Sequence, residues 1–162
     1  MKKISCILLA FVFVMTLFVA PINAETINEK QSFESTVIEY EDGSYLIIFV
    51  PEFTMVNSMR STATTILAEQ PARFTNSSGE IEWEYTLTAT FSYVYGSSAT
   101  CTNASYDYTI YENSWEFSNG SSSRSGATAY GYGTFKNKFL FVTTKTINVD
   151  LSMTCDIYGN VS

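Results

Sequence analysis

The chain has 162 residues, of which 15% are aromatic and 15% charged, and it carries a net charge of −7 with no histidine. An acidic surface repels phosphate backbones and anionic lipids, so nucleic acid is not an expected partner. Without histidine the chain cannot hold a Ser-His-Asp triad, a Cys-His pair or a His-ligated zinc, and we expect neither a metal nor a cofactor.

Residues 1–24 have the layout of a secretory signal peptide. Two lysines precede an apolar run from Ile4 to Ala20, and a cleavage region of small residues ends at Ala24. Removing 24 of the 162 residues leaves 138, with seven basic and sixteen acidic side chains and hence a net charge of −9. We expect a secreted protein that does not stay at the membrane. The alternative is an uncleaved anchor helix, because the apolar run is about long enough to span a thin bilayer.

Cys101 and Cys155 are the only cysteines that remain after this cleavage. Exported proteins fold in oxidising surroundings, where two thiols pair, so we predict a Cys101–Cys155 disulfide. Closing a loop of this length restricts the unfolded chain by an amount worth about 4 kcal/mol. Zinc binding would need about four Cys or His ligands, and a catalytic thiol would need a neighbouring base, usually histidine.

The first part of the mature chain predicts a flexible segment followed by strands. Residues 25–32 are polar and are expected to be flexible, and residues 33–162 are expected to form a single domain. Asp42-Gly43 predicts a hairpin turn between two strands. Thr54–Phe74 is ambiguous between a short helix and a strand, and its threonine-rich part favours a strand.

The middle of the chain holds the clearest strand pattern. Ile81–Tyr95 alternates between apolar and polar residues, which is typical of a half-buried antiparallel strand. Ala99–Tyr111 is predicted to return as the next strand. The serine-rich stretch from Ser118 to Gly126 has no such alternation, and we predict turn or loop structure there.

Two more strands are predicted at the end of the chain, Ala127–Lys136 and Lys138–Cys155, with Asn137 separating them. In the first of these, Tyr130 and Tyr132 share one face, while alanine, glycine and one phenylalanine occupy the other. If the small residues pack into the core, the tyrosines form an exposed aromatic strip. If the tyrosines are core residues, the glycines only ease a bend.

Regularly spaced strands with polar turns predict an all-β fold, an antiparallel β-sandwich held by one disulfide, with a small β-barrel as the alternative. Cys155 falls on the apolar face of the last strand, so its partner should reach it from inside the core. Trp115 is either an anchor of that core or an exposed aromatic platform.

Two resemblances accompany this pattern. The order Cys101, Trp115, Cys155 resembles that of immunoglobulin domains, although Met153 stands where those domains usually carry tyrosine. Residues 81–162 also resemble a family of small exported domains of Gram-positive bacteria, on the stretches WEYTLTATFSY, SATCTNASYDYTIY, GTFK and TCDIYGNVS. That family has no assigned function, so the resemblance implies export and an all-β fold but no catalytic residue.

Carboxylates are the remaining candidates for catalysis. Glu82 and Glu84 lie two apart on one strand face, a little under ~7 Å between Cα atoms, which is compatible with a glycosidase pair. Neighbours on one strand rarely face each other across a substrate, so a solvated face is the expected role. Asp156 and Asn160 offer too few oxygens for Ca²⁺ and predict a terminal turn.

We therefore predict an exported, non-enzymatic module that binds a cell-surface glycan or protein through Tyr130, Tyr132 or Trp115. The first alternative is a glycan-acting enzyme that uses carboxylates alone, which requires two acids facing each other across a cleft. The second is a membrane-active or self-associating β-protein, in which amphipathic strands such as Ile81–Tyr95 form hairpins.

Overall fold

The computed structural model describes residues 35–56 and 62–162. Within these ranges the chain forms two antiparallel sheets and no helix, which confirms the all-β prediction. The predicted signal peptide (1–24), the segment 25–32 and the first residues of the predicted domain lie outside the described residues. In the described part there is no helix of the length and apolarity that crossing a membrane requires.

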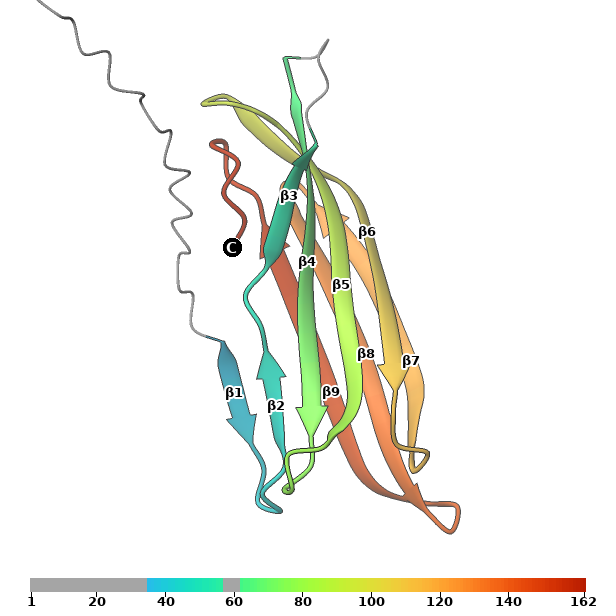
Figure 1. Cartoon of the computed structure of the whole chain (residues 1–162). Helices are drawn as coiled ribbons and strands as arrows, with labels where there is room; N and C mark the ends of the chain where they lie inside the picture. The colour runs from blue at the N-terminus through green and yellow to red at the C-terminus, as the bar shows by residue number, and fades with distance from the viewer. Residues whose placement is uncertain (1–34, 57–61) are drawn as a thin grey trace, which may run out of the picture. The chain divides into compact units, whose positions relative to one another are not determined.

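Nine strands make up the two sheets. They are β1 (Thr36–Glu39), β2 (Tyr45–Ile48), β3 (Glu52–Val56), β4 (Thr64–Thr75), β5 (Ile81–Val94), β6 (Ser98–Ile110), β7 (Trp115–Ser125), β8 (Thr128–Phe139) and β9 (Val142–Thr154). The first sheet has the order β1-β2-β4-β5-β6, with β3 also paired to β4, and the second has the order β7-β8-β9 (Figure 1). The strands therefore form two separate sheets, as in a sandwich, and not one sheet closed on itself.

The N-terminal strands follow the turn signals of the sequence. Gly43 has a φ of 78° in the turn that joins β1 to β2, which confirms the hairpin predicted at Asp42-Gly43. β3 and β4 confirm the strand interpretation of Thr54–Phe74 in its described part. Pro71 lies in β4 between the residues paired with β3 and those paired with β2, so its missing N–H removes no ladder hydrogen bond.

The alternating residues of β5 point into a core that both sheets share. Six of the eight side chains predicted for this face are fully or almost fully buried, and the two at its ends, Ile81 and Tyr95, are exposed. The buried six are Trp83, Tyr85, Leu87, Ala89, Phe91 and Tyr93, and Phe135 of β8 is buried against them. The Trp83 ring stacks on the Phe135 ring of the other sheet with centroids 3.8 Å apart and an interplanar angle of 3°. Aromatic stacking between the sheets thus fixes their spacing at this level.

The glycines of β8 make room for side chains of the opposite sheet. A Cβ atom at Gly133 would lie 2.9 Å from Cε2 of Tyr85, and one at Gly131 would lie 3.0 Å from Cδ1 of Leu87. The Tyr85 hydroxyl crosses the core and donates a hydrogen bond to the carbonyl oxygen of Tyr132 at 3.1 Å. The small face of β8 is therefore the inner one, which turns the tyrosine side chains of this strand outward.

β7 corrects the prediction of turn or loop structure from Ser118 to Gly126, because the chain pairs with β8 throughout Trp115–Ser125. A Cβ atom at Gly120 would lie only 2.3 Å from Cζ of Phe117 and 3.1 Å from Cζ of Tyr106. Aromatic rings already fill the space beneath this strand, so its inward positions must be small. The strand consequently lacks the apolar alternation by which strands are recognised.

The predicted break at Asn137 is also corrected. β8 continues through Asn137 to Phe139, with only a register irregularity between Asn137 and Lys138. The Asn137 amide nitrogen donates to the Ser114 hydroxyl at 2.9 Å and so holds the strand to the chain before β7. The turn to β9 lies further on, at residues 140–141.

Candidate tyrosine-lined functional site

The outer surface of the three-stranded sheet carries the candidate site, which we call the tyrosine face. Strand register places Ser123, Tyr130 and Ser152 in one row and Ser121, Tyr132 and Asp150 in the next. These six residues define the tyrosine face and line, together with the backbone of β8 and β9, a hollow of about 270 Å³. The two rows are two residues apart along each strand, or about 7 Å, so both are open to one bound molecule.

The two tyrosines of this face differ in freedom. Tyr130 is 44% exposed, and no described residue takes a hydrogen bond from its hydroxyl. The Tyr132 hydroxyl donates to Oδ1 of Asn148 at 3.2 Å and accepts from the Thr134 hydroxyl at 2.7 Å. One ring is thus fixed along the sheet while the other is available to a ligand.

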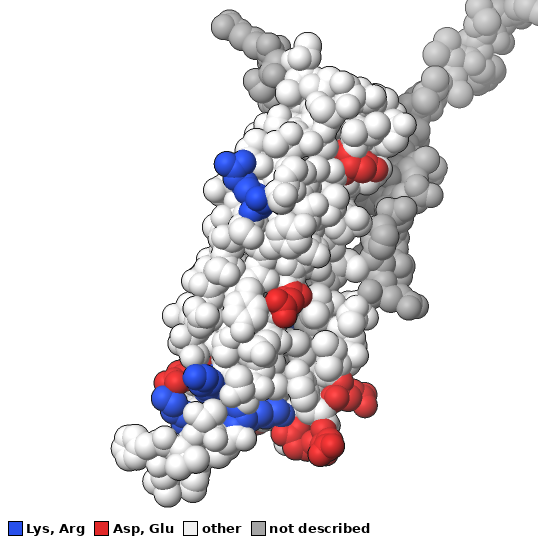
Figure 2. Space-filling view, turned by 180° about the vertical axis from the view of Figure 1, so that it is seen from behind, with Lys and Arg blue, Asp and Glu red and all other residues white. Residues whose placement is uncertain are grey.

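Charge is sparse on this side of the molecule. Figure 2 shows the face of the three-stranded sheet with isolated charged groups over its middle and both basic and acidic groups toward its lower end. Asp150 is the one carboxylate among the residues of the tyrosine face, and the serines supply hydroxyl donors and acceptors. Aromatic rings beside such groups suit an uncharged ligand with apolar faces and many hydroxyls, which describes a sugar.

A second hollow of about 370 Å³ lies where the β1–β2 turn approaches β9. There Nζ of Lys145 donates to Oδ2 of Asp42 at 2.7 Å and to the Ser44 hydroxyl at 2.5 Å, and lies 4.6 Å from the Tyr40 ring centroid. Hydrogen bonds from Lys145 and Ser44 hold the pKa of Asp42 well below its usual value. Because these groups bond to one another, they fasten the β1–β2 hairpin to the other sheet and are not free for a ligand.

Trp115 is a core residue, which corrects its prediction as a possible ligand-binding aromatic. Only 5% of it is exposed, and its indole N–H donates to Oε2 of Glu82 at 2.8 Å. Its ring packs edge-on against Phe74 and Trp83, with centroids 5.1 and 6.0 Å away. Of the three aromatic residues predicted to bind a ligand, only Tyr130 and Tyr132 therefore lie on the outer face of the three-stranded sheet.

The two glutamates considered for catalysis are each bound to a neighbour. Glu82 accepts from Trp115, and Glu84 accepts from Arg73 at 2.6 Å and from the Tyr111 hydroxyl at 2.8 Å. Partial burial alone would raise the pKa of Glu84, but the hydrogen bonds from Tyr111 and Arg73 outweigh it and lower that pKa. Both carboxylates are thus held by hydrogen bonds within the protein, and the lowered pKa of Glu84 is the opposite of what a general acid needs.

The terminal turn forms as predicted. Asp156 accepts the backbone N–H groups of Tyr158 at 2.8 Å and Asn160 at 2.9 Å, as well as the Asn160 amide at 2.8 Å. These hydrogen bonds use the carboxylate oxygens that a cation would need. Across residues 35–56 and 62–162, no three acidic or cysteine side chains gather in a way that could hold a metal ion.

Cys101 and Cys155 are buried free thiols, so the predicted disulfide is not formed in the structure. Their backbone N–H groups donate to consecutive carbonyls of the β7–β8 turn, Cys101 to Gly126 at 2.8 Å and Cys155 to Ala127 at 3.0 Å. Burial raises the pKa of both thiols, that of Cys155 to about 11. The fold therefore brings the two cysteines to the same end of the core and keeps both protonated.

Comparison with known protein families, curated proteins and solved structures finds no match for this chain. The resemblance to small exported domains of Gram-positive bacteria accordingly stays a prediction. The sequence singled out Tyr130 and Tyr132 but not the serines and Asp150 beside them, because β7 was not recognised as a strand. Their signal is positional: Ser121 and Ser123 alternate in step with the tyrosines that they flank.

Proposed function

We propose that the protein is an exported, non-enzymatic module that binds a cell-surface polysaccharide on the tyrosine face. The observation that carries this proposal is the exposed Tyr130 ring next to a fixed Tyr132 ring, in a hollow otherwise lined by hydroxyls, backbone and Asp150. The layout of residues 1–24 supports export to the surface where such polymers occur.

The composition of the face favours a polysaccharide over a protein partner. Stable protein interfaces bury about 800 Å² on each side and centre on large anchors in desolvated pockets. The tyrosine face offers instead two rings among small hydroxylated side chains, in a hollow of about 270 Å³. Tyr130 would stack on the apolar face of a sugar ring, while Asp150 and the serines would bind its hydroxyls.

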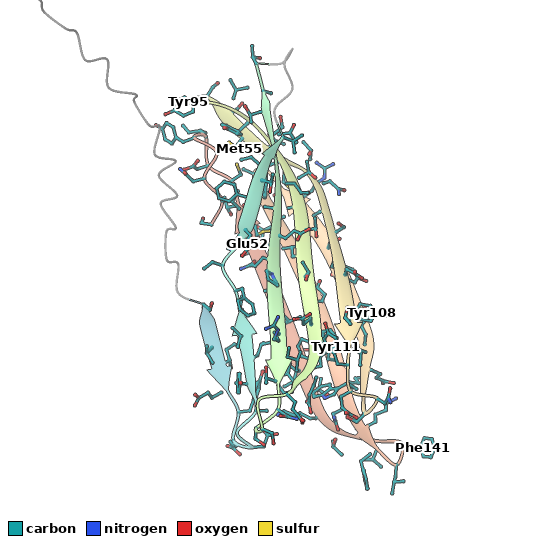
Figure 3. The ribbon with its side chains drawn as sticks, in the orientation of Figure 1. Glu52, Met55, Tyr95, Tyr108, Tyr111 and Phe141 are labelled. Carbon is teal, nitrogen blue, oxygen red and sulfur yellow. The ribbon has the colours of Figure 1, made fainter. Side chains whose placement is uncertain are left out.

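Binding can be tested with the chain from residue 25 on a panel of insoluble and soluble polysaccharides and peptidoglycan. Tyr130→Ala should weaken binding about tenfold, because it removes the stacking surface. Tyr95→Ala is the matched control, since Tyr95 is 75% exposed but lies in a turn at the upper end of the molecule and is not part of the tyrosine face (Figure 3). Failure of every polysaccharide to bind, or equal losses for the two variants, would contradict the proposal.

We also propose that Cys101 and Cys155 form a disulfide after export. Both thiols lie at the β7–β8 turn end of the core, and the mature chain offers no other cysteine. Oxidised glutathione is a suitable oxidant: the S–S bond forms as the two thiols give up two electrons and two protons, and the oxidant becomes two thiols. The bond would join β6 of one sheet to the end of β9 in the other.

A further inference from the structure

The turn between β8 and β9 carries the most exposed apolar side chains in the described part of the chain. Phe139 is 67% exposed, Leu140 75%, Phe141 98% and Val142 64%. We call these four residues the apolar tip. Figure 3 shows Phe141 projecting from the lower end of the sheet, away from the other labelled residues. Four consecutive exposed apolar residues are uncommon on a folded surface and indicate a contact with something outside the chain.

Backbone conformation at the tip makes these residues more unusual. Leu140 has a φ of 48° and Phe141 a φ of 70°, both in the left-handed region. A two-residue hairpin turn of this kind favours Asn-Gly, which would relieve the strain and also remove the apolar exposure. Leu140 and Phe141 bear both the backbone strain and the cost of exposing apolar surface, which points to a functional role for their side chains.

The hairpin that carries the apolar tip also carries three lysines. Three of the five Lys and Arg residues in the described ranges, Lys136, Lys138 and Lys145, lie on this hairpin, and no acidic residue occurs from Lys136 to Val149. Lys138 pairs with Glu116 and Lys145 with Asp42, both through close contacts of 2.6 and 2.7 Å, whereas Lys136 forms no ion pair with any described residue. In Figure 2 basic groups, with acidic groups beside them, lie just above the uncharged projection at the lower end.

From this arrangement we infer that the apolar tip inserts into the surface of a lipid bilayer that contains anionic lipid. Leu140 and Phe141 lie beyond the last paired residues, Phe139 and Val142, so their side chains can enter the boundary between headgroups and acyl chains, which is about 5–10 Å deep. The lysines then lie at the level of the phosphates, where long side chains with a charged end are stable. The net charge of the whole chain predicts repulsion from such lipids, but the segment from Lys136 to Val149 itself carries three lysines and no acidic residue.

A bilayer fits the apolar tip better than a second copy of the chain does. Two tips meeting end to end would bring their lysines together, and like charges repel. Four side chains also fall short of the roughly 800 Å² that each partner of a stable interface buries. The tip lies about 24 Å along β8 from Tyr132, so lipid contact leaves the tyrosine face open.

Vesicle sedimentation tests this inference with the chain from residue 25, whose truncation leaves every described residue in place. Wild-type protein should bind vesicles of phosphatidylcholine with 30% phosphatidylglycerol, bind pure phosphatidylcholine less, and be released by salt. The double variant Leu140→Asn/Phe141→Gly should lose at least about tenfold in binding, because two apolar side chains no longer enter the bilayer. The same variant should unfold at a higher temperature than wild type, since its turn residues suit the left-handed conformation.

Two further variants separate the apolar and the electrostatic parts. Lys136→Gln should weaken binding about fivefold on the anionic vesicles and leave binding to pure phosphatidylcholine unchanged. Tyr95→Ala, which removes an exposed ring from another turn, should bind like wild type. The inference is overturned if wild type does not sediment with anionic vesicles or if the double variant binds them equally well. It is also overturned if wild type is a dimer that the double variant makes monomeric, which would assign the tip to a second copy.

Discussion

Loss of the proposed Cys101–Cys155 bond should lower the free energy of unfolding by an amount set by the length of the loop that the bond closes. The bond would close a loop of about 55 residues, for which the chain-entropy relation gives about 4 kcal/mol. In a domain of this size each kcal/mol shifts the unfolding temperature by roughly 3–4 °C, so the expected loss is about 15 °C. Only 1% of each cysteine is exposed, so alanine is a better replacement than serine, whose hydroxyl would be buried without a partner.

The assay is thermal unfolding followed by circular dichroism, on protein recovered after export, with and without dithiothreitol. The unfolding temperature of the wild type should fall by about 15 °C on reduction. Cys101→Ala/Cys155→Ala should unfold at the same temperature as the reduced wild type, whether or not reductant is present. Thiol titration of the unfolded wild type should find no free thiol before reduction and two after it. Two free thiols in the exported protein, together with an unfolding temperature that reductant does not change, would refute the reasoning.

Two other predictions follow from the fold. Gly133→Ala should cost about 1–3 kcal/mol in urea unfolding, because its Cβ would lie 2.9 Å from the Tyr85 ring and 3.1 Å from Val149; an unchanged midpoint would show that the core can expand there. Asp42→Asn should destabilise the protein at pH 5, where the ion pair with Lys145 is intact. Because the pKa of Asp42 is lowered in the folded state, its contribution is complete above the unfolded pKa of about 3.9 and is lost as the pH falls through the lowered value. The difference between wild type and Asp42→Asn should therefore vanish in strong acid, and a difference that persists there would assign the effect to something other than the carboxylate charge.

The sequence predicted those strands whose side chains divide cleanly between core and solvent. In β5 the residues from Trp83 to Tyr93 alternate because one face meets the other sheet, and the burial follows the predicted pattern. The residues of β9 from Ile147 to Met153 do the same. A period of two is a direct consequence of such a position, so these strands could be recognised without knowing their partners.

Elements shaped by distant contacts could not be predicted in this way. Gly120 is small because Phe117 and Tyr106 occupy the space beside it, a requirement that no neighbour in sequence reveals. The turn at Leu140 and Phe141 breaks the usual residue preference, whereas the polar Asn137 that suggested a turn is instead bonded to Ser114. Turn preferences predicted Asp42-Gly43 correctly because no other contact opposed them. For the candidate site, the tyrosines were found, but their outward orientation depended on which face the glycines of β8 occupy.

The hydrogen bond from the Tyr85 hydroxyl to the Tyr132 carbonyl links the core to the outside of the molecule. It fixes the backbone directly beneath the exposed rings to a fully buried side chain of the opposite sheet. A ligand would therefore meet a surface that is already ordered, and little conformational entropy would be lost when it binds. Ser121, Ser123 and Ser152 are exposed and bear no such constraint. Core contacts thus determine the shape of this surface, whereas substitution of one of the three serines can change which ligand it selects and leave the fold intact.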